Sequence, residues 1–286
     1  MKRYTKLIIL LGAVGISVSA PLTRISTAPS LVLALYRNGL AVLALLPVVL
    51  TRHRADLKGL SRRAFLLCMA SGVFLALHFA FYLESIQQTS IAAATILTNT
   101  QVFFVAVIMW TLLKEKLKKL CWLGIALTFT GGMIIALGGS GGGVTFFGNM
   151  LALLSAVFMA VYAVIGRFCR KDMSNTVYVF LVYSATTVTL LMACALSGTA
   201  MLGYDGINWL TAGGMTLFCT FMGHSIFSWG LKYETPALVA TIQSLEPVFA
   251  TLLGIVLFAE IPSLTVILGG CIVVGGVTLY CRHSDN

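Results

Sequence analysis

Ten apolar runs, each long enough to cross a lipid bilayer, follow one another along the chain. A transmembrane helix needs about 20 apolar residues, whereas a barrel strand needs about half that number and alternates in polarity. The runs are residues 7–24, 30–50, 64–85, 90–113, 120–138, 146–166, 176–197, 208–230, 236–259 and 264–281. Backbone polar groups in lipid must be satisfied within their own segment, so the pattern predicts an all-α integral membrane protein with ten transmembrane helices.

Composition and charge placement agree with a chain that is embedded in lipid. Of the 286 residues, 59% are hydrophobic and 10% are charged, against about 25% charged residues in a soluble domain. A net charge of +10 suits nucleic-acid binding only where the cations form one patch. Here 17 of the 19 Lys and Arg residues lie in the N-terminal tail, in alternate loops or at the C-terminus, as the positive-inside rule requires. We therefore expect a bacterial inner-membrane protein with both termini in the cytoplasm, surrounded by lipid and binding no nucleic acid.

The first run also resembles a signal peptide, because a basic tail precedes it and Ser19-Ala20 resembles a cleavage site. Pro21 directly after that site disfavours cleavage, and the apolar run continues towards Arg24. We interpret the run as the first transmembrane helix.

Motifs for catalysis or metal binding are absent from the sequence. The seven cysteines are scattered without a C-x-x-C pair, so neither a disulfide framework nor a metal site is indicated. Residues 138–142 satisfy the G-x-S-x-G expression, but no strand precedes them and the segment is typical of a linker. We expect no cofactor, no metal and no enzymatic activity.

The chain contains an internal repeat. Residues 89–103 match residues 235–249 at an offset of 146, and at the same offset His78 falls on His224. At an offset of 145, Gly124 falls on Gly269 and Gly131 on Gly276. Each copy spans five predicted helices, residues 1–138 and 146–281. Because five is odd, the second copy enters the membrane with reversed orientation, an arrangement that secondary transporters use for alternating access.

Several motifs of the chain resemble one known family. They are Ser244-Leu245-Glu246-Pro247-Val248-Phe249-Ala250, Ala259-Glu260, Leu268-Gly269-Gly270, Gly275-Gly276-Val277, Gln101-Val102-Phe103, Lys114-Glu115-Lys116-Leu117, Leu123-Gly124-Ile125, Gly223-His224-Ser225, Trp229-Gly230-Leu231-Lys232 and Tyr36-Arg37. Together they are similar to the EamA-like family of the drug/metabolite transporter superfamily. The resemblance implies ten helices in two inverted five-helix repeats and transport of small organic solutes. One position departs from the family pattern, because Gln101 stands where the first repeat usually has a proline.

The strongest candidate for a binding site is Glu246, the one charge within residues 236–259. An acidic group near the bilayer midplane costs about 2.5–3.5 kcal/mol unless it faces a partner or water. Pro247 has no N–H and frees the carbonyl of Gln243, so the helix is expected to be irregular there. Irregular backbone at membrane depth is tolerated where it lines a cavity. The alternative is a protonated Glu246 that only bonds a neighbouring helix.

Residues 90–113 supply an unusually polar middle, with Thr98, Asn99 and Gln101 as the candidate opposite wall of the cavity. Such residues also join helices without any substrate role. Residues 64–85 add Tyr82 and His78, and His224 occupies a mirrored depth in residues 208–230. Tyr82 is assigned to the cavity, and the two histidines to gating or proton relay, with hydrogen-bonded packing as the alternative.

The two cations outside the cytoplasmic loops differ in expected role. Arg37 lies about 10 Å below the outer surface. It can attract an anionic substrate group, act in gating, pair with Glu84 or extend towards the interface. Arg24 is expected to be an interfacial anchor. The glycine-rich helices at 120–138 and 264–281 are expected to be scaffold or a homodimer face.

The sequence therefore predicts a secondary transporter that exports or exchanges small organic metabolites such as amino acids, with protons as a candidate coupling ion. Glu246, Gln243, Asn99, Gln101, Thr98 and Tyr82 form the expected central site. The alternative is an uncoupled facilitator or channel for small solutes.

Overall fold

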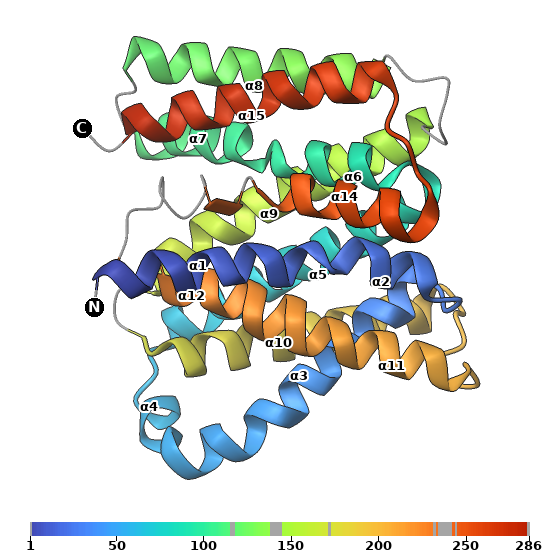
Figure 1. The fold of residues 1–286 in the computed structure, drawn as a ribbon. Coiled ribbons are helices and arrows are strands. Elements are labelled where there is room, and N and C mark those ends of the chain that lie inside the picture. The colour runs from blue at the N-terminus through green and yellow to red at the C-terminus, as the bar shows by residue number, and fades with distance from the viewer. Residues whose placement is uncertain are drawn as a thin grey trace.

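In the computed structural model, the described residues are 2–114, 118–137, 145–170, 173–230, 233, 242–243 and 245–284. All regular secondary structure within these residues is helical (Figure 1). The elements are α1 (Lys2–Ser17), α2 (Ser19–Ile25), α3 (Ser30–Arg52), α4 (Arg54–Lys58), α5 (Arg62–Gln88), α6 (Ile91–Asn99), α7 (Gln101–Leu113), α8 (Lys119–Leu137), α9 (Phe146–Cys169), α10 (Asn175–Leu196), α11 (Gly206–Gly214), η1 (Met215–Ser225), α12 (Ile226–Gly230), α14 (Glu246–Phe258) and α15 (Leu264–Ser284).

Six helical stretches in the described part of the chain are long and apolar enough to cross a membrane. They are Tyr4–Ile25, Ser30–Arg52, Arg62–Gln88, Ile91–Thr111, Phe146–Cys169 and Asn175–Leu196, and shorter apolar helices cover Lys119–Ile135, Glu246–Phe258 and Leu264–Tyr280. The expected run 208–230 forms α11, η1 and α12 in succession. Much of the predicted helix at 236–259, like the predicted linker at 138–142, lies outside the described residues. The helical class is confirmed for the described residues, and the count of ten stays a prediction.

Two predicted continuous helices are broken, one next to Pro21 and the other without a proline. The run 7–24 divides at Val18 into α1 and α2. The run 90–113 divides at Thr100, where ψ is −2°. The N–H of Thr100 bonds the carbonyl of Leu97, three residues back, at 3.1 Å, in place of the carbonyl four residues back that a regular α-helix uses. The Thr100 hydroxyl also donates to the carbonyl of Leu97, at 2.6 Å. A hydroxyl that bonds nearby backbone competes with the regular hydrogen bonds of a helix. This explains how a new helix begins at Gln101, although no proline stands at that position.

The third irregularity lies beside Pro247. Helix α14 begins at Glu246, so Pro247 occupies the first turn, where a missing N–H costs nothing. The sequence placed Pro247 inside a longer helix at 236–259. Ile242 and Gln243 are helical, and the N–H of Leu245 bonds the carbonyl of Ile242 at 3.1 Å in a tighter turn. The chain therefore restarts a helix at the carboxylate, in agreement with the irregular helix expected beside Pro247.

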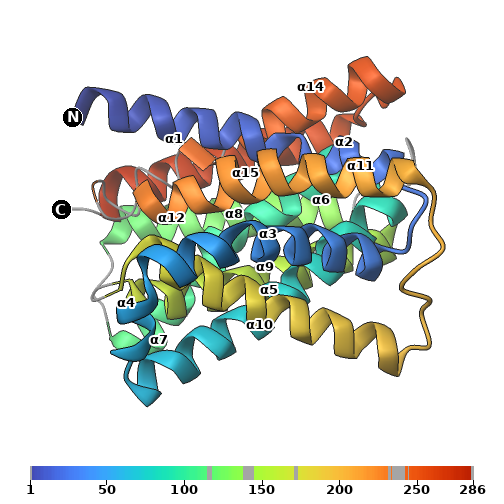
Figure 2. The same ribbon diagram turned by 90° about the horizontal axis from the view of Figure 1, so that it is seen from below.

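Helices α5 and α9 pack along each other, and α10 packs against both α3 and α5. Helices α8 and α15 lie side by side at the top of Figure 1, and both views place the two chain ends at the same end of the molecule (Figures 1 and 2). A Cβ built on Gly124 would lie 2.7 Å from the carbonyl oxygen of Gly276, and one on Gly131 would lie 2.7 Å from that of Gly269. The two helices therefore run antiparallel at backbone contact, and these glycines act as scaffold within one chain.

Candidate functional site

A small cavity lies where α5, α6, α14 and η1 meet α1 to α3. Its volume is about 20 Å³, and its lining residues are Ile16, Ser19, Arg37, His78, Phe79, Tyr82, Thr98, Asn99, Gln101, Met159, His224, Gln243 and Glu246. A space of this size holds a single water molecule. All nine residues that the sequence singled out for binding, gating or proton relay line this one cavity, although they come from distant segments.

Glu246 turns its carboxylate into the cavity from the first turn of α14. The residue is 6% exposed, and Oε2 accepts a hydrogen bond from Asn99 Nδ2 at 3.2 Å. Oε1 lies 3.5 Å from the Tyr82 hydroxyl, which donates to it. A helix N-terminus carries partial positive charge, so the start of α14 favours a carboxylate at this position.

Arg37 reaches the same cavity from α3 and is 1% exposed. Its Nε donates to Thr220 Oγ1 at 2.8 Å, and its Cζ lies 4.2 Å from the centre of the Phe79 ring. Its Nη2 has no hydrogen-bond partner, and among the described residues no carboxylate lies within ion-pair distance of the guanidinium. A buried charge without an ionic partner is costly, so the cavity holds a cation that is incompletely satisfied.

The structure overturns two of the interpretations considered for Arg37. The side chain does not extend towards a membrane surface, because it is buried beside the cavity. It does not pair with Glu84, whose carboxylate accepts hydrogen bonds from Ser30 at 2.8 Å and from Gln88 at 2.9 Å. Arg37 is therefore left facing the cavity.

The two histidines face each other across the cavity. Their ring centroids lie 6.4 Å apart at 71°, and the Phe79 ring packs against both, at 5.2 Å from His78 and 5.4 Å from His224. His78 Nδ1 lies 3.1 Å from the Ser155 carbonyl, and its ring stacks on that of Tyr82 at 5.7 Å. Titratable groups thus follow one another from Glu246 through Tyr82 and His78 to His224.

The remaining predicted residues form the polar wall. Thr98 Oγ1 lies 2.9 Å from Ser155 Oγ, and Asn99 Nδ2 also donates to the carbonyl of Thr95 at 3.0 Å. Gln101 begins α7 directly after the break at Thr100, and Gln243 precedes the restart of α14. The break at Thr100 and the start of α14 at Glu246 therefore both border the cavity.

Sequence reasoning missed several lining residues. Ile16, Phe79 and Met159 look like ordinary apolar positions, and nothing in their spacing sets them apart. Ser19 lies directly after the break between α1 and α2, is buried, and its Oγ has no hydrogen-bond partner. A small polar residue within an apolar run is the available signal, and the sequence interpretation of Ser19 as part of a cleavage site does not use it.

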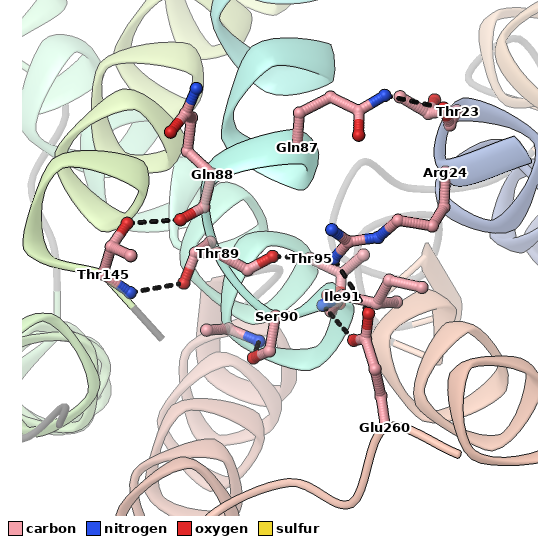
Figure 3. Close-up of polar contacts among 11 residues, drawn as sticks. Thr23, Arg24, Gln87, Gln88, Thr89, Ser90, Ile91, Thr95, Thr145 and Glu260 are labelled. Carbon is pink, nitrogen blue, oxygen red and sulfur yellow. Dashed lines mark hydrogen bonds and ion pairs between the residues drawn. The ribbon is translucent and has the colours of Figure 1, made fainter. Parts of the chain in front are cut away.

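Arg24, the expected interfacial anchor, also contacts a distant segment of the chain. Its Nη2 makes an ion pair with Glu260 Oε1 at 2.9 Å and a hydrogen bond to the carbonyl of Thr89 at 2.8 Å (Figure 3). These residues border a second hollow of about 570 Å³, which is also lined by Gln87, Gln88, Ser90, Thr145, Ala259 and Ile261. The contact joins α2 to the turn after α14.

Comparisons with known proteins identify a family, related transporters and a similar fold. A family model described as the EamA-like transporter family matches residues 4–137 and 146–282. An uncharacterized transporter, YdfC, of Bacillus subtilis (strain 168) is 29% identical over 265 residues, which cover 86% of this chain and 79% of that protein. An uncharacterized transporter of Archaeoglobus fulgidus is 25% identical over 213 residues, covering 73% and 72% of the two chains. A solved crystal structure shares the fold, with a TM-score of 0.70 over 99% of both chains at 18% identity.

Proposed function

Because the chain belongs to the EamA-like transporter family, we propose that this multi-pass membrane transporter exports or exchanges small zwitterionic metabolites such as amino acids across the bacterial cytoplasmic membrane. The nine cavity residues form its binding and gating site. Alternating access moves the solute, and proton exchange at Glu246 drives the cycle.

The unpartnered Nη2 of Arg37, in a cavity that also holds the carboxylate of Glu246, is the observation that carries this proposal. The two groups face one space without forming an ion pair with each other. A solute with its own carboxylate and ammonium group can pair with both. Guanidinium binds carboxylate well because its planar donors match the two oxygens.

The size of the cavity supports alternating access. Binding pockets for small molecules usually measure about 300–1,000 Å³, far above the volume of about 20 Å³ found here. A metabolite enters only after the surrounding helices separate. The conformation is therefore closed around the site, which a transport cycle requires between its two open states.

Two reciprocal features support an inverted repeat of residues 1–138 and 146–281. The contact of Gly124 with Gly276 becomes the contact of Gly269 with Gly131 when the two halves are exchanged. The two non-glycine residues with positive φ in the described chain are Lys114 at 53° and Ala259 at 54°. They end α7 and α14, which begin at Gln101 and Glu246. We therefore also propose that the chain has ten transmembrane helices, five in each half, and that the two halves have opposite orientations in the membrane.

The orientation follows from the positive-inside rule. Helix α4, with Arg54 and Lys58, lies at the same end of the molecule as both chain ends (Figure 1). We place this end in the cytoplasm and the Arg24–Glu260 contact at the outer surface.

Purified protein in detergent tests the ligand class, because a ligand that binds only the folded state raises the unfolding temperature. Amino acids are compared with matched amines and monocarboxylates that lack one of the two charges. Stabilisation by the zwitterions but not by the single-charge analogues supports the proposal. Equal stabilisation by amines alone, or no stabilisation by any amino acid, contradicts it.

Proteoliposomes test the transport mode. Exchange of internal for external labelled solute, saturable and dependent on a pH gradient, supports a coupled carrier. Flux that does not saturate, with no counter-exchange, identifies the uncoupled facilitator instead.

A further inference from the structure

The Arg24–Glu260 contact (Figure 3) links both predicted halves of the chain. It lies where α2 meets the turn after α14, at the end opposite the termini (Figure 1). Arg24 Nη2 holds Glu260 Oε1 at 2.9 Å, and Glu260 Oε2 accepts the backbone N–H of Ile91 at 2.9 Å. Arg24 also donates to the carbonyl of Thr89 at 2.8 Å. One carboxylate from the second half is thus held by a side chain and a backbone group of the first half.

Each of the three helices that meet in this contact also reaches the central cavity. Helix α2 begins with Ser19 and carries Arg24 near its end. Helix α6 begins with Ile91 and ends with Asn99. Helix α14 begins with Glu246, and Glu260 lies two residues beyond its last residue, Phe258. A contact that fixes the outer ends of these three helices therefore also fixes three cavity-lining positions.

The backbone before Glu260 is unusual. Ala259 has φ of 54° and ψ of 27°, a left-handed conformation that a residue with a Cβ adopts at an energetic cost. The turn returns the N–H of Glu260 to the Gly254 carbonyl at 3.3 Å and directs its carboxylate towards Arg24. Strained backbone of this kind persists where the surrounding contacts over-determine it.

The connection between α5 and α6 is tied down on its other side. Gln87 Nε2 donates to the carbonyl of Thr23 at 2.9 Å, and the Thr145 hydroxyl donates to the carbonyl of Gln88 (Figure 3). Thr89 Oγ1 donates to Asn149 Oδ1 at 3.0 Å. The connection between α5 and α6 is therefore held against α2 and α9. Its backbone can then bind the carboxylate of Glu260 without moving.

We propose that Arg24 and Glu260 form an outer latch, an ion pair that closes the outer end of the transport pathway and must separate before solute leaves the central cavity on that side. The side chains are 24% and 23% exposed, so water can reach them. A partly exposed ion pair is modest in strength, which suits a contact that opens in each cycle. The inference rests on the alternating access proposed above, but not on the identity of the solute.

Accessibility of the cavity in membrane vesicles tests the latch. A Ser19→Cys variant places a thiol in the cavity wall, and a membrane-impermeant thiol reagent is added at the face opposite the termini. Mass spectrometry measures modification at that position alone, so the native cysteines do not contribute. We expect Glu260→Gln or Arg24→Gln to raise the rate of modification about fivefold, the factor that an ion pair of this strength supports. A rate that stays unchanged in both variants overturns the latch.

Two controls separate loss of the latch from loss of charge. Asp205→Asn removes an exposed acid from the loop before α11, and Arg52→Gln removes an exposed cation from the end of α3. Neither is expected to change the rate. An equal acceleration in a control variant contradicts the latch, because the effect then depends on net charge.

A second measurement covers variants that fold poorly. Arg24→Cys combined with Glu260→Cys is bridged with a reducible bifunctional thiol reagent, because an Arg and a Glu side chain that meet at their ends span more than a direct disulfide does. Exchange is measured before and after reduction of the bridge, and we expect block with the bridge intact and recovery on reduction. Full exchange with the bridge intact overturns the latch. Failure to find a solute leaves the labelling result unaffected, so failure of the proposed function is distinguished from failure of the latch.

Discussion

Asn99 donates a hydrogen bond to the carboxylate of Glu246 at 3.2 Å across 147 residues of chain. Each residue lies at a helix interruption, since Asn99 ends α6 and Glu246 begins α14. The two interruptions face each other at the cavity. The polar residues at these breaks are therefore available both to each other and to a bound solute.

Glu246→Gln is expected to remove the dependence of exchange on a pH gradient, because the amide keeps the shape of the side chain but cannot bind or release a proton. Exchange without net proton movement should survive at a reduced rate. Proteoliposomes with an imposed pH gradient provide the measurement. Glu84→Gln is the matched control, because that acid bonds Ser30 and Gln88 outside the cavity. Unchanged pH dependence in Glu246→Gln would remove this carboxylate from coupling.

Arg37→Met is expected to lower the affinity for carboxylate-bearing ligands by about 10-fold to 100-fold, since a hydrogen bond to a charged group contributes about 1.5–3 kcal/mol. Methionine keeps an apolar contact with Phe79. Binding is measured by ligand-induced shift of the unfolding temperature. Arg52→Met, at the exposed end of α3, serves as control. Equal affinity for a carboxylate and its amide analogue in the wild type would contradict an anion-binding role.

Gly131→Ala is expected to destabilise the protein by about 1–3 kcal/mol, the usual cost of overpacking. The added Cβ would lie 2.7 Å from the backbone carbonyl of Gly269, which cannot move aside without shifting α15. Gly275→Ala is the control on that neighbouring helix, because nothing lies within 4 Å of its Cβ position. Thermal unfolding in detergent compares the two, and equal stability of both variants would contradict backbone contact between α8 and α15.

Asn208→Ala is expected to destabilise the segment between α2 and α3 by about 2 kcal/mol or more, because it leaves buried donors without an acceptor. Asn208 Oδ1 accepts hydrogen bonds from Ser26 Oγ at 2.8 Å and from the N–H groups of Thr27 and Ala28, each at 2.9 Å. Asn208→Asp keeps an acceptor at that place and should lose less. Proteolysis or hydrogen exchange of the segment between α2 and α3 provides the readout, and equal protection in the wild type and Asn208→Ala would exclude this role.

The sequence could identify Glu246 as a candidate because a charge within an apolar run is costly wherever it lies. It could pair His78 with His224 because the repeat offset places them at mirrored depths. It could not locate the break at Thr100, because threonine hydroxyls bond nearby backbone carbonyls both in helices that stay continuous and in helices that break. It also could not find Ser19 as a wall residue, because burial beside a cavity depends on which helix packs opposite.

Arg24 shows most clearly why contacts between distant helices could not be predicted from the sequence. Its position near the end of an apolar run is typical of an interfacial anchor, and no local signal connects it with Glu260. The ion pair exists because α2 and the turn after α14 meet at one end of the fold. Arg37 is similar, since only the packing of α3 against η1 shows that its guanidinium points inward.

The sequence by itself determined the helical membrane class, the family and the candidate residues, because hydrophobic run length, cation placement and isolated polar groups are properties of single segments that lipid selects directly. The tertiary structure decided which of those residues share a cavity, that Arg37 faces it without an ionic partner, and that Arg24 pairs with Glu260. These relations join residues that are far apart in the chain, so they depend on how the helices pack and cannot be read from any one helix.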